Sequence, residues 1–296
     1  MKTIKIVFKI LVLAVLYLVC FVIASGAFVR VPADDAAAIE GAGNAGLALL
    51  IVALLNTLTL SYPILRSRWS GLKLTGAVFL AMFGAATFMS QIETAAFPAV
   101  ADRLPEGMLI GIVLAGLAQA ILFAPLAVWV LGKMKAKADG EPNERLQMPL
   151  KEWAWKLGII IAAYEILYFS FGYYVAWRNP GVHTYYGGTD PGSFILQLQS
   201  VWRNTPWLFA FQALRAMLWT AIVLPVIRMM KGRPWETALA VGLLFAVLMN
   251  AQHLLPNPYM PRAVSMAHLA ETASFNFIFG WIVGWLLLWK RQKADS

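Results

Sequence analysis

The stretch ILVLAVLYLVCFVIASGAFV, residues 10–29, decides the fold of this chain. It is an unbroken apolar run, and a helix of this length crosses ~30 Å of hydrocarbon at ~1.5 Å per residue. In lipid a helix satisfies its own backbone hydrogen bonds, so the run predicts a transmembrane helix. Lys2, Lys5 and Lys9 precede it, as in a signal peptide. The run is longer than a typical signal-peptide core, so a retained helix is predicted.

Similar apolar runs recur along the whole chain. We expect eight spans, at residues 6–28, 43–64, 73–92, 107–132, 153–177, 206–227, 235–254 and 264–289. The 296-residue chain is 60% hydrophobic and 13% charged, about half the charged fraction of a typical soluble domain. The sequence lacks the short segments of alternating polarity that build a membrane β-barrel. The predicted fold class is therefore all-α, a polytopic membrane helical bundle of about eight transmembrane helices.

Lysine and arginine are distributed unevenly between the two sides of this arrangement. They gather at both ends of the chain and in alternate connections: Lys2, Lys5, Lys9, Arg66, Arg68, Lys73, Lys133, Lys135, Lys137, Arg145, Lys151, Arg228, Lys231, Arg233, Lys290, Arg291 and Lys293. The other connections carry one or two each: Arg30, Arg103, Arg178, Arg203 and Arg262. The positive-inside rule predicts that both termini are cytoplasmic, in a multi-pass protein of the cell (inner or plasma) membrane. The net charge of +9 then reports topology, and no nucleic-acid partner is expected.

The two halves of the chain resemble each other at the ends of their spans. The matched segments are RVP at 30–32 with RNP at 178–180, and PILR at 63–66 with PVIR at 225–228. They predict a parallel 4+4 duplication, with residues 1–133 and 151–296 as the halves and 134–150 as a cytoplasmic linker. The alternative is that proline and arginine simply favour helix ends.

The outer connection at residues 178–205 is long and rich in turn signals. Its second part, residues 193–202, has apolar residues at the spacing of a short helix lying on the membrane surface. An ordinary packed loop is the alternative.

Four polar residues fall inside the predicted spans of the second half at similar depths. Glu165, Arg215, Asn250 and Glu271, one on each span, lie ~18 to ~22 Å from the cytoplasmic ends by the helix rise. Polar groups are expensive in hydrocarbon, so each is a candidate functional residue. We expect Glu165 and Arg215 to form an ion pair, which leaves Glu271 as a surplus carboxylate. The alternative is a pair that only joins two helices.

Further candidates lie about one helical turn from these residues. His268 precedes Glu271 by three positions, and Gln212 precedes Arg215 by three, so each pair shares a helix face. The candidate substrate or proton site therefore comprises Glu165, Arg215, Glu271, His268, Asn250, Gln212 and Tyr168. The first half looks like a scaffold, with Gln91 and Glu93 near its outer surface.

A zinc site is a weaker hypothesis. His268 and Glu271 share a helix face, and His253 from the preceding span would complete three ligands with an open fourth position. A HExxH motif is missing from the sequence, as are a P-loop and a dinucleotide fingerprint. Cys20 is the single cysteine, which excludes an intrachain disulfide or a thiolate site. No cofactor is expected.

Three functions fit these features. The first is a carrier or permease for a small solute or ion, with an outward-facing site in the second half and Glu165 or Glu271 exchanging a proton. The alternatives are a membrane-embedded enzyme that acts on a lipid-type substrate through His268 and Glu271, and a non-catalytic subunit of a membrane assembly. The lipid bilayer is the predicted partner, while enzymatic activity, substrate, coupling ion and oligomeric state stay open.

Overall fold

The computed structural model describes residues 2–37, 42–135, 143–188, 190 and 192–289. Eight helices in these ranges are long and apolar enough to cross a membrane. They are α1 (Lys2–Phe28), α3 (Ala45–Leu65), α4–η2–α5 (Gly71–Ala96), α7 (Met108–Val130), α8 (Leu150–Tyr174), α11 (Trp207–Met229), α12–η4–η5 (Pro234–Leu254) and α13 (Arg262–Leu288). The predicted all-α polytopic membrane bundle is confirmed, and each observed span overlaps its predicted one.

Each span has a lipid-facing side and a buried side, as α1 illustrates. Leu13, Tyr17, Cys20 and Ala24 are buried, and their helical spacing places them on one face. The other side exposes large aliphatic residues along most of the helix. Because lipid and protein interior are both apolar, such a helix is hydrophobic all round, and its composition does not reveal which side packs.

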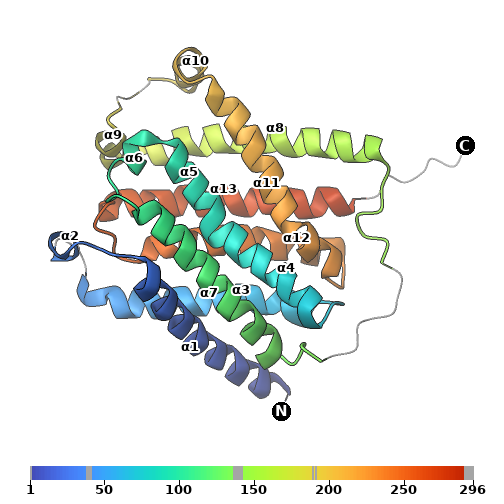
Figure 1. The fold of residues 1–296 in the computed structure, drawn as a ribbon. Helices are drawn as coiled ribbons and strands as arrows, with labels where there is room; N and C mark the ends of the chain where they lie inside the picture. The colour runs from blue at the N-terminus through green and yellow to red at the C-terminus, as the bar shows by residue number, and fades with distance from the viewer. Residues whose placement is uncertain (1, 38–41, 136–142, 189, 191, 290–296) are drawn as a thin grey trace, which may run out of the picture.

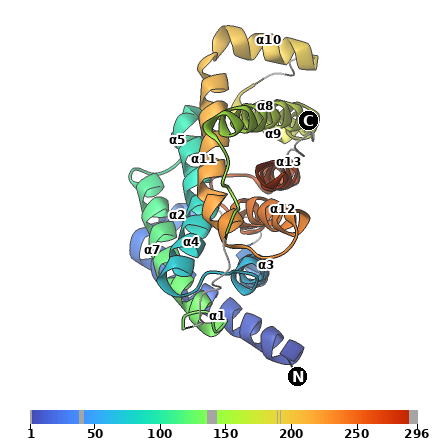
Figure 2. The same ribbon diagram turned by 90° about the vertical axis from the view of Figure 1, so that its right-hand side faces the viewer.

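The eight spans form two layers that cross obliquely. Figure 2 shows α3, α8, α12 and α13 end-on in one layer, beside a second layer of α1, α7, α4–α5 and α11. Each predicted half supplies three spans to one layer and its second span, α3 or α11, to the other. As a result α11 packs on α4 as well as on α8, and α3 packs on the α12–η4–η5 span as well as on α1.

The packing of the spans repeats between the two halves. α1 contacts α3 and α7 as α8 contacts α11 and α13, and α4 contacts α7 as α12 contacts α13. The third span of each half also contains a wider π-type turn, η2 (Gly84–Phe88) and η4 (Leu244–Leu248). A parallel duplication would produce these matches. The 4+4 division itself stays a prediction, and residues 136–142 of the proposed linker lie outside the described ranges.

The turns that follow α3 and α11 are tied together on one face of the molecule. Ser67 and Met230 form an antiparallel bridge. The Arg68 N–H donates to the Met229 carbonyl at 2.8 Å, and the Lys231 N–H donates to the Arg66 carbonyl at 2.8 Å. We call this side the basic face and define it by residues 2–9, 66–73, 132–135, 143–151 and 228–234. It is the side that the sequence predicts to be cytoplasmic.

Small residues bring α13 close to α12. A Cβ added at Gly280 would lie 2.8 Å from Gly242 Cα, and one at Gly284 would lie 2.7 Å from Ala238 Cα. Helix backbones approach this closely only where side chains are missing or minimal. These contacts fix α13, which carries His268 and Glu271, against its neighbour.

The opposite face carries the short elements. They are α2 (Ala33–Ala37), η1 (Ala42–Asn44), α6 (Pro98–Ala101), η3 (Ala176–Arg178), α9 (Pro180–Tyr186) and α10 (Phe194–Asn204). The helix predicted at 193–202 is thus present as α10, begun by the Ser193 hydroxyl, which accepts the Leu196 N–H at 3.3 Å. Figure 1 shows α10 end-on and α8 lengthwise, and Figure 2 shows the reverse. The perpendicular axis and the exposed Ile195 and Trp202 suit a helix on the membrane surface, a position that stays a prediction.

Candidate functional site

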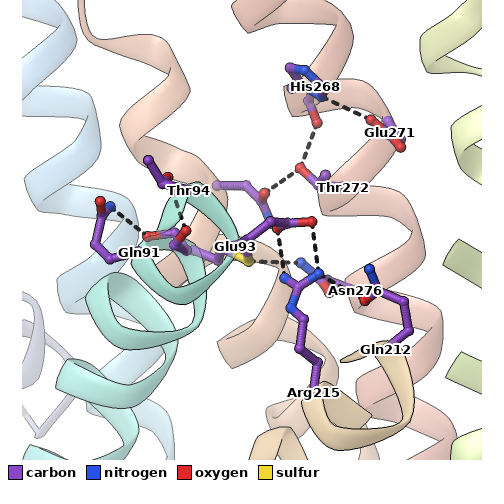
Figure 3. A network of polar contacts seen from close by, with 12 residues as sticks. Gln91, Glu93, Thr94, Gln212, Arg215, His268, Glu271, Thr272 and Asn276 are labelled. Atoms are coloured by element: carbon purple, nitrogen blue, oxygen red, sulfur yellow. Dashed lines mark hydrogen bonds and ion pairs between the residues drawn. The ribbon is translucent and has the colours of Figure 1, made fainter. Parts of the chain in front are cut away.

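Polar side chains from both halves meet inside the bundle, toward the face opposite the basic one. Figure 3 shows them on α5 (Met89–Ala96), on α11 and on α13. The cluster has two parts, an arginine–carboxylate pair and a chain of hydrogen bonds centred on a histidine. Both parts lie among helices whose other inward residues are mostly apolar or aromatic.

Arg215 is the centre of the first part. Its guanidinium makes two bonds to the Glu93 carboxylate, Nη1 to Oε1 at 2.8 Å and Nη2 to Oε2 at 2.7 Å. Nη1 also donates to Gln212 Oε1 at 3.1 Å. The Arg215 side chain is 1% exposed and that of Glu93 is 27% exposed. A bidentate pair of this kind neutralises a charge that would otherwise be very costly inside a membrane.

The expected Glu165–Arg215 pair is wrong. Glu165 is only partly buried, and nothing in the described ranges bonds to its carboxylate. Its neighbour Tyr164 is fully buried, with the Arg215 guanidinium carbon 5.9 Å from its ring centre. Successive helical residues point about 100° apart, so the tyrosine occupies the face that meets Arg215 and the glutamate is turned away.

Side-chain direction explains why Glu93 takes the place of Glu165. Side chains on a helix lean toward its N-terminus. α11 enters from the face opposite the basic one and α5 runs toward that face, so Arg215 leans outward and Glu93 leans inward. The two therefore converge although their backbone depths differ. Sequence reasoning placed Glu93 beyond the end of the third span, and the helix in fact continues to Ala96.

The second part of the site is a chain of three titratable side chains. His268 Nδ1 lies 2.9 Å from Glu271 Oε2, and His268 Nε2 lies 2.9 Å from the Tyr186 hydroxyl. An ionised carboxylate only accepts hydrogen bonds, so Nδ1–H donates to Glu271 and Nε2 accepts from Tyr186. Burial, followed by the negative charges of Glu93 and Glu271, raises the pKa of Tyr186. The phenol therefore stays protonated and remains the donor.

Glu271 is buried within the bundle, and its side chain is 10% exposed. Tyr186, which bonds to His268 at 2.9 Å, belongs to α9. The Arg103 guanidinium holds this short helix by donating to the Tyr185 carbonyl at 2.6 Å, and the Tyr185 hydroxyl donates to the Tyr259 carbonyl at 3.1 Å. Nothing in the sequence distinguished Tyr186 from the other tyrosines of this connection.

Asn250 joins the cluster indirectly. Its amide donates to the Ala246 carbonyl at 2.8 Å, and its oxygen is in hydrogen-bond contact with the Thr272 hydroxyl. That hydroxyl also lies 2.5 Å from the His268 carbonyl. Asn250 therefore links the end of η4 to the turn of α13 that carries His268 and Glu271.

Tyr168 lies between the two parts. Its ring packs against Tyr164, with 6.4 Å between ring centres. Glu93, Arg215 and Glu271 all lie within electrostatic range of its phenol. The candidates predicted from sequence thus gather around the interior, apart from Glu165. Glu93, Tyr186 and Thr272 complete the cluster, and Glu93 comes from the half that the sequence indicated as scaffold.

His253, His268 and Glu271 are not arranged as the ligands of a zinc ion. His253 stacks on His268 with 6.1 Å between ring centres, and both ring nitrogens of His268 already bond to Glu271 and Tyr186. Across the described ranges, no three His, Cys, Asp or Glu side chains gather as metal ligands would.

Comparison with known proteins adds no assignment. No protein-family model, curated protein or solved structure matches the chain. Any function is therefore argued from the geometry of the site.

Proposed function

We propose that the chain is a proton-coupled carrier of a small solute or ion. One observation carries this proposal: Glu271 is a buried carboxylate whose bonded partner is a titratable imidazole, while the neighbouring Arg215 is matched by Glu93. Taking up a proton turns the His268–Glu271 contact from a neutral imidazole with an anion into a pair with no net charge. Inside a membrane this change of charge alters the free energy needed to move α13, the helix that carries both residues.

The hydrogen-bond chain supplies a route for the proton. Tyr186 lies outside the spans, on α9, and its hydroxyl contacts the imidazole that contacts Glu271. A phenol, an imidazole and a carboxylate in series are groups that pass a proton along hydrogen bonds. α9 lies over the site, so movement of this helix would open the chain to the outer solution.

Polar atoms around Arg215 supply contacts for a solute. Gln212 Nε2, Arg215 Nε and Asn276 Oδ1 are buried, and none has a hydrogen-bond partner in the described part of the chain. Figure 3 shows Gln212 and Asn276 beside the arginine. Buried polar atoms without partners are uncommon, and a binding site is one physical reason for them. Arg215 would bind an anionic group of the solute in exchange for Glu93.

We also propose that the basic face is cytoplasmic and that the membrane is the cell membrane. The described lysines and arginines of residues 5–9, 66–73, 133–135, 145–151 and 228–233 lie at this face, while the opposite face carries few in the described ranges. This asymmetry is the signal that orients most multi-pass proteins.

Transport is tested by reconstituting the protein on a solid-supported membrane. Capacitive currents are recorded after concentration jumps of amino acids, organic acids, sugars, and mono- and divalent cations, at several pH values. At least one solute class should give a current that Glu271→Gln abolishes. Glu165→Gln is the matched control, because the Glu165 carboxylate also lies within a span but bonds to none of the described residues. The proposal fails if no class gives a current, or if Glu271→Gln transports like the wild type.

A further inference from the structure

A cavity of about 580 Å³ lies at the basic face, far from the polar cluster. Its walls are the segment 143–148, the first turns of α8, the turn at Gly232 and the end of α13. It is independent of the proposed transport site, because the two lie toward opposite ends of the spans.

Two arginines line this cavity, and no carboxylate among the described residues bonds to either of them. The Arg145 guanidinium donates to neutral acceptors, the Ile227 carbonyl at 3.1 Å, the Thr237 hydroxyl at 2.8 Å and the Gly232 carbonyl at 2.7 Å. The buried Nε of Arg68 has no partner among the described residues. Burial, and then the positive charge of Arg68, lower the pKa of Arg145. The two cations therefore lie close enough to repel each other.

The other charged groups near the cavity have partners of their own. Lys156 is neutralised by Glu152 at 2.7 Å and donates to the Trp289 carbonyl at 2.8 Å. Glu144 also belongs to the lining, and the Glu236 carboxylate, whose charge raises the pKa of Arg145, is bonded to Arg66 at 3.0 Å. An anion bound between Arg68 and Arg145 would satisfy an open donor and relieve the like-charge contact.

The wall that presents Arg145 is held in a fixed shape. Asn143 donates to the Arg228 carbonyl at 2.7 Å and accepts the Arg145 N–H at 3.1 Å. Leu146 has a φ of 63°, a left-handed conformation that a residue with a side chain adopts only when its surroundings enforce it. The segment thus holds the guanidinium in place before any ligand arrives.

The remaining wall is suited to lipid. Trp285 and Trp289 line the cavity and are 45% and 44% exposed. Tryptophan is typical of the zone where lipid headgroups meet the acyl chains. Basic pockets between spans on the cytoplasmic side are also where acidic headgroups bind.

We propose that this cavity binds a phosphate group between Arg68 and Arg145. The exposed tryptophans favour the headgroup of an anionic lipid as its source. A free phosphate carries the same chemistry and is the other source to be tested.

The test uses the full chain purified in a neutral detergent and measures dissociation constants by native mass spectrometry. The probes are dioctanoyl phosphatidic acid, dioctanoyl phosphatidylcholine and inorganic phosphate. The wild type should bind phosphatidic acid in preference to phosphatidylcholine. Arg68→Gln should weaken that binding about tenfold, the worth of one charge-assisted hydrogen bond. Arg228→Gln is the matched control, because it removes an exposed arginine of the same face that does not line the cavity.

Arg68→Lys checks that the protein tolerates the change and should keep part of the binding, because it keeps the charge. Inorganic phosphate binding that Arg68→Gln weakens would support the site and name free phosphate as the source. Equal affinity for the two lipids without phosphate binding would overturn the proposal. So would equal loss of affinity in Arg68→Gln and Arg228→Gln.

Discussion

The ion pair of Arg215 with Glu93 leads to a quantitative prediction. It distinguishes this pairing from the Glu165–Arg215 pair that the sequence suggests. Arg215 is 1% exposed and bonded through both terminal nitrogens, whereas Glu93 is 27% exposed. Removing one partner of a buried ion pair costs about 3–5 kcal/mol, because the other charge is left uncompensated. The cost should be unequal for the two partners, since only Glu93 retains access to solvent.

We expect Glu93→Gln to lower the free energy of unfolding by about 3–4 kcal/mol, because the fully buried guanidinium loses its counter-charge. Arg215→Met should cost less, about 1–3 kcal/mol, because an orphaned carboxylate can take up a proton. The double variant should then be close to Arg215→Met alone. That pattern corresponds to a coupling energy of about 3–4 kcal/mol, which is the full cost of Glu93→Gln.

Equilibrium unfolding by sodium dodecyl sulfate in mixed micelles measures these differences. The control is the same cycle with Glu165→Gln, which should be additive with Arg215→Met to within about 0.5 kcal/mol. A coupling below about 0.5 kcal/mol between Glu93 and Arg215 would refute the reasoning. So would a larger coupling of Arg215 with Glu165 than with Glu93.

Three further predictions test other parts of the structure. Tyr186→Phe should lower the free energy of unfolding by about 1 kcal/mol in the same assay, because the hydrogen bond to His268 is lost. Tyr174→Phe, which changes an exposed tyrosine, should have no measurable effect. Equal effects of the two substitutions would contradict the hydrogen-bond chain. Gly280→Ala should destabilise the protein by about 1–3 kcal/mol, because the added Cβ would lie 2.8 Å from Gly242 Cα. Gly158→Ala, whose Cβ would meet nothing within 4 Å, should be neutral or stabilising. Equal melting points of the two variants would refute the close helix contact. In a Cys20→Ala background, an impermeant thiol reagent applied to intact cells should label Thr184→Cys and not Arg228→Cys, and the reverse pattern would invert the proposed orientation.

Span number and span position were predictable from the sequence because both depend on a simple quantity, the length of an apolar run. Which side of each helix packs against the bundle was not predictable. α1 is largely apolar on its lipid side and on its buried side alike, so Leu13 and Ala14 carry no mark that separates them from the exposed Val15 and Val19. In a soluble helix the polar face would have supplied that mark.

Residue pairing in the site was predictable only in part, for the same reason. His268 and Glu271 lie one turn apart on one helix, so their contact follows from helical spacing alone. The partner of Arg215 depended on which helices are neighbours, and the placement of α11 beside α4 and α5 is a property of the two-layer packing. Tyr186 reaches His268 only because α9 folds back over the bundle. The contact of His268 with Glu271 was therefore predictable from the sequence, and the contacts between the two layers were not.

The two halves are joined at both ends of the spans, and the two joints differ in kind. At the basic face the joint includes a pair of backbone hydrogen bonds around Ser67 and Met230, which no change of protonation removes, beside the ion pair of Arg66 with Glu236 at 3.0 Å. Toward the other face it includes the side-chain pair of Glu93 and Arg215, which a proton on the carboxylate or an anion on the arginine would open. A carrier of the proposed kind must loosen one end of its site while the other stays closed. The outer joint is the one that a ligand can exchange, so the first step expected of a solute or proton is to separate α5 from α11 while the backbone bridge holds the basic face together.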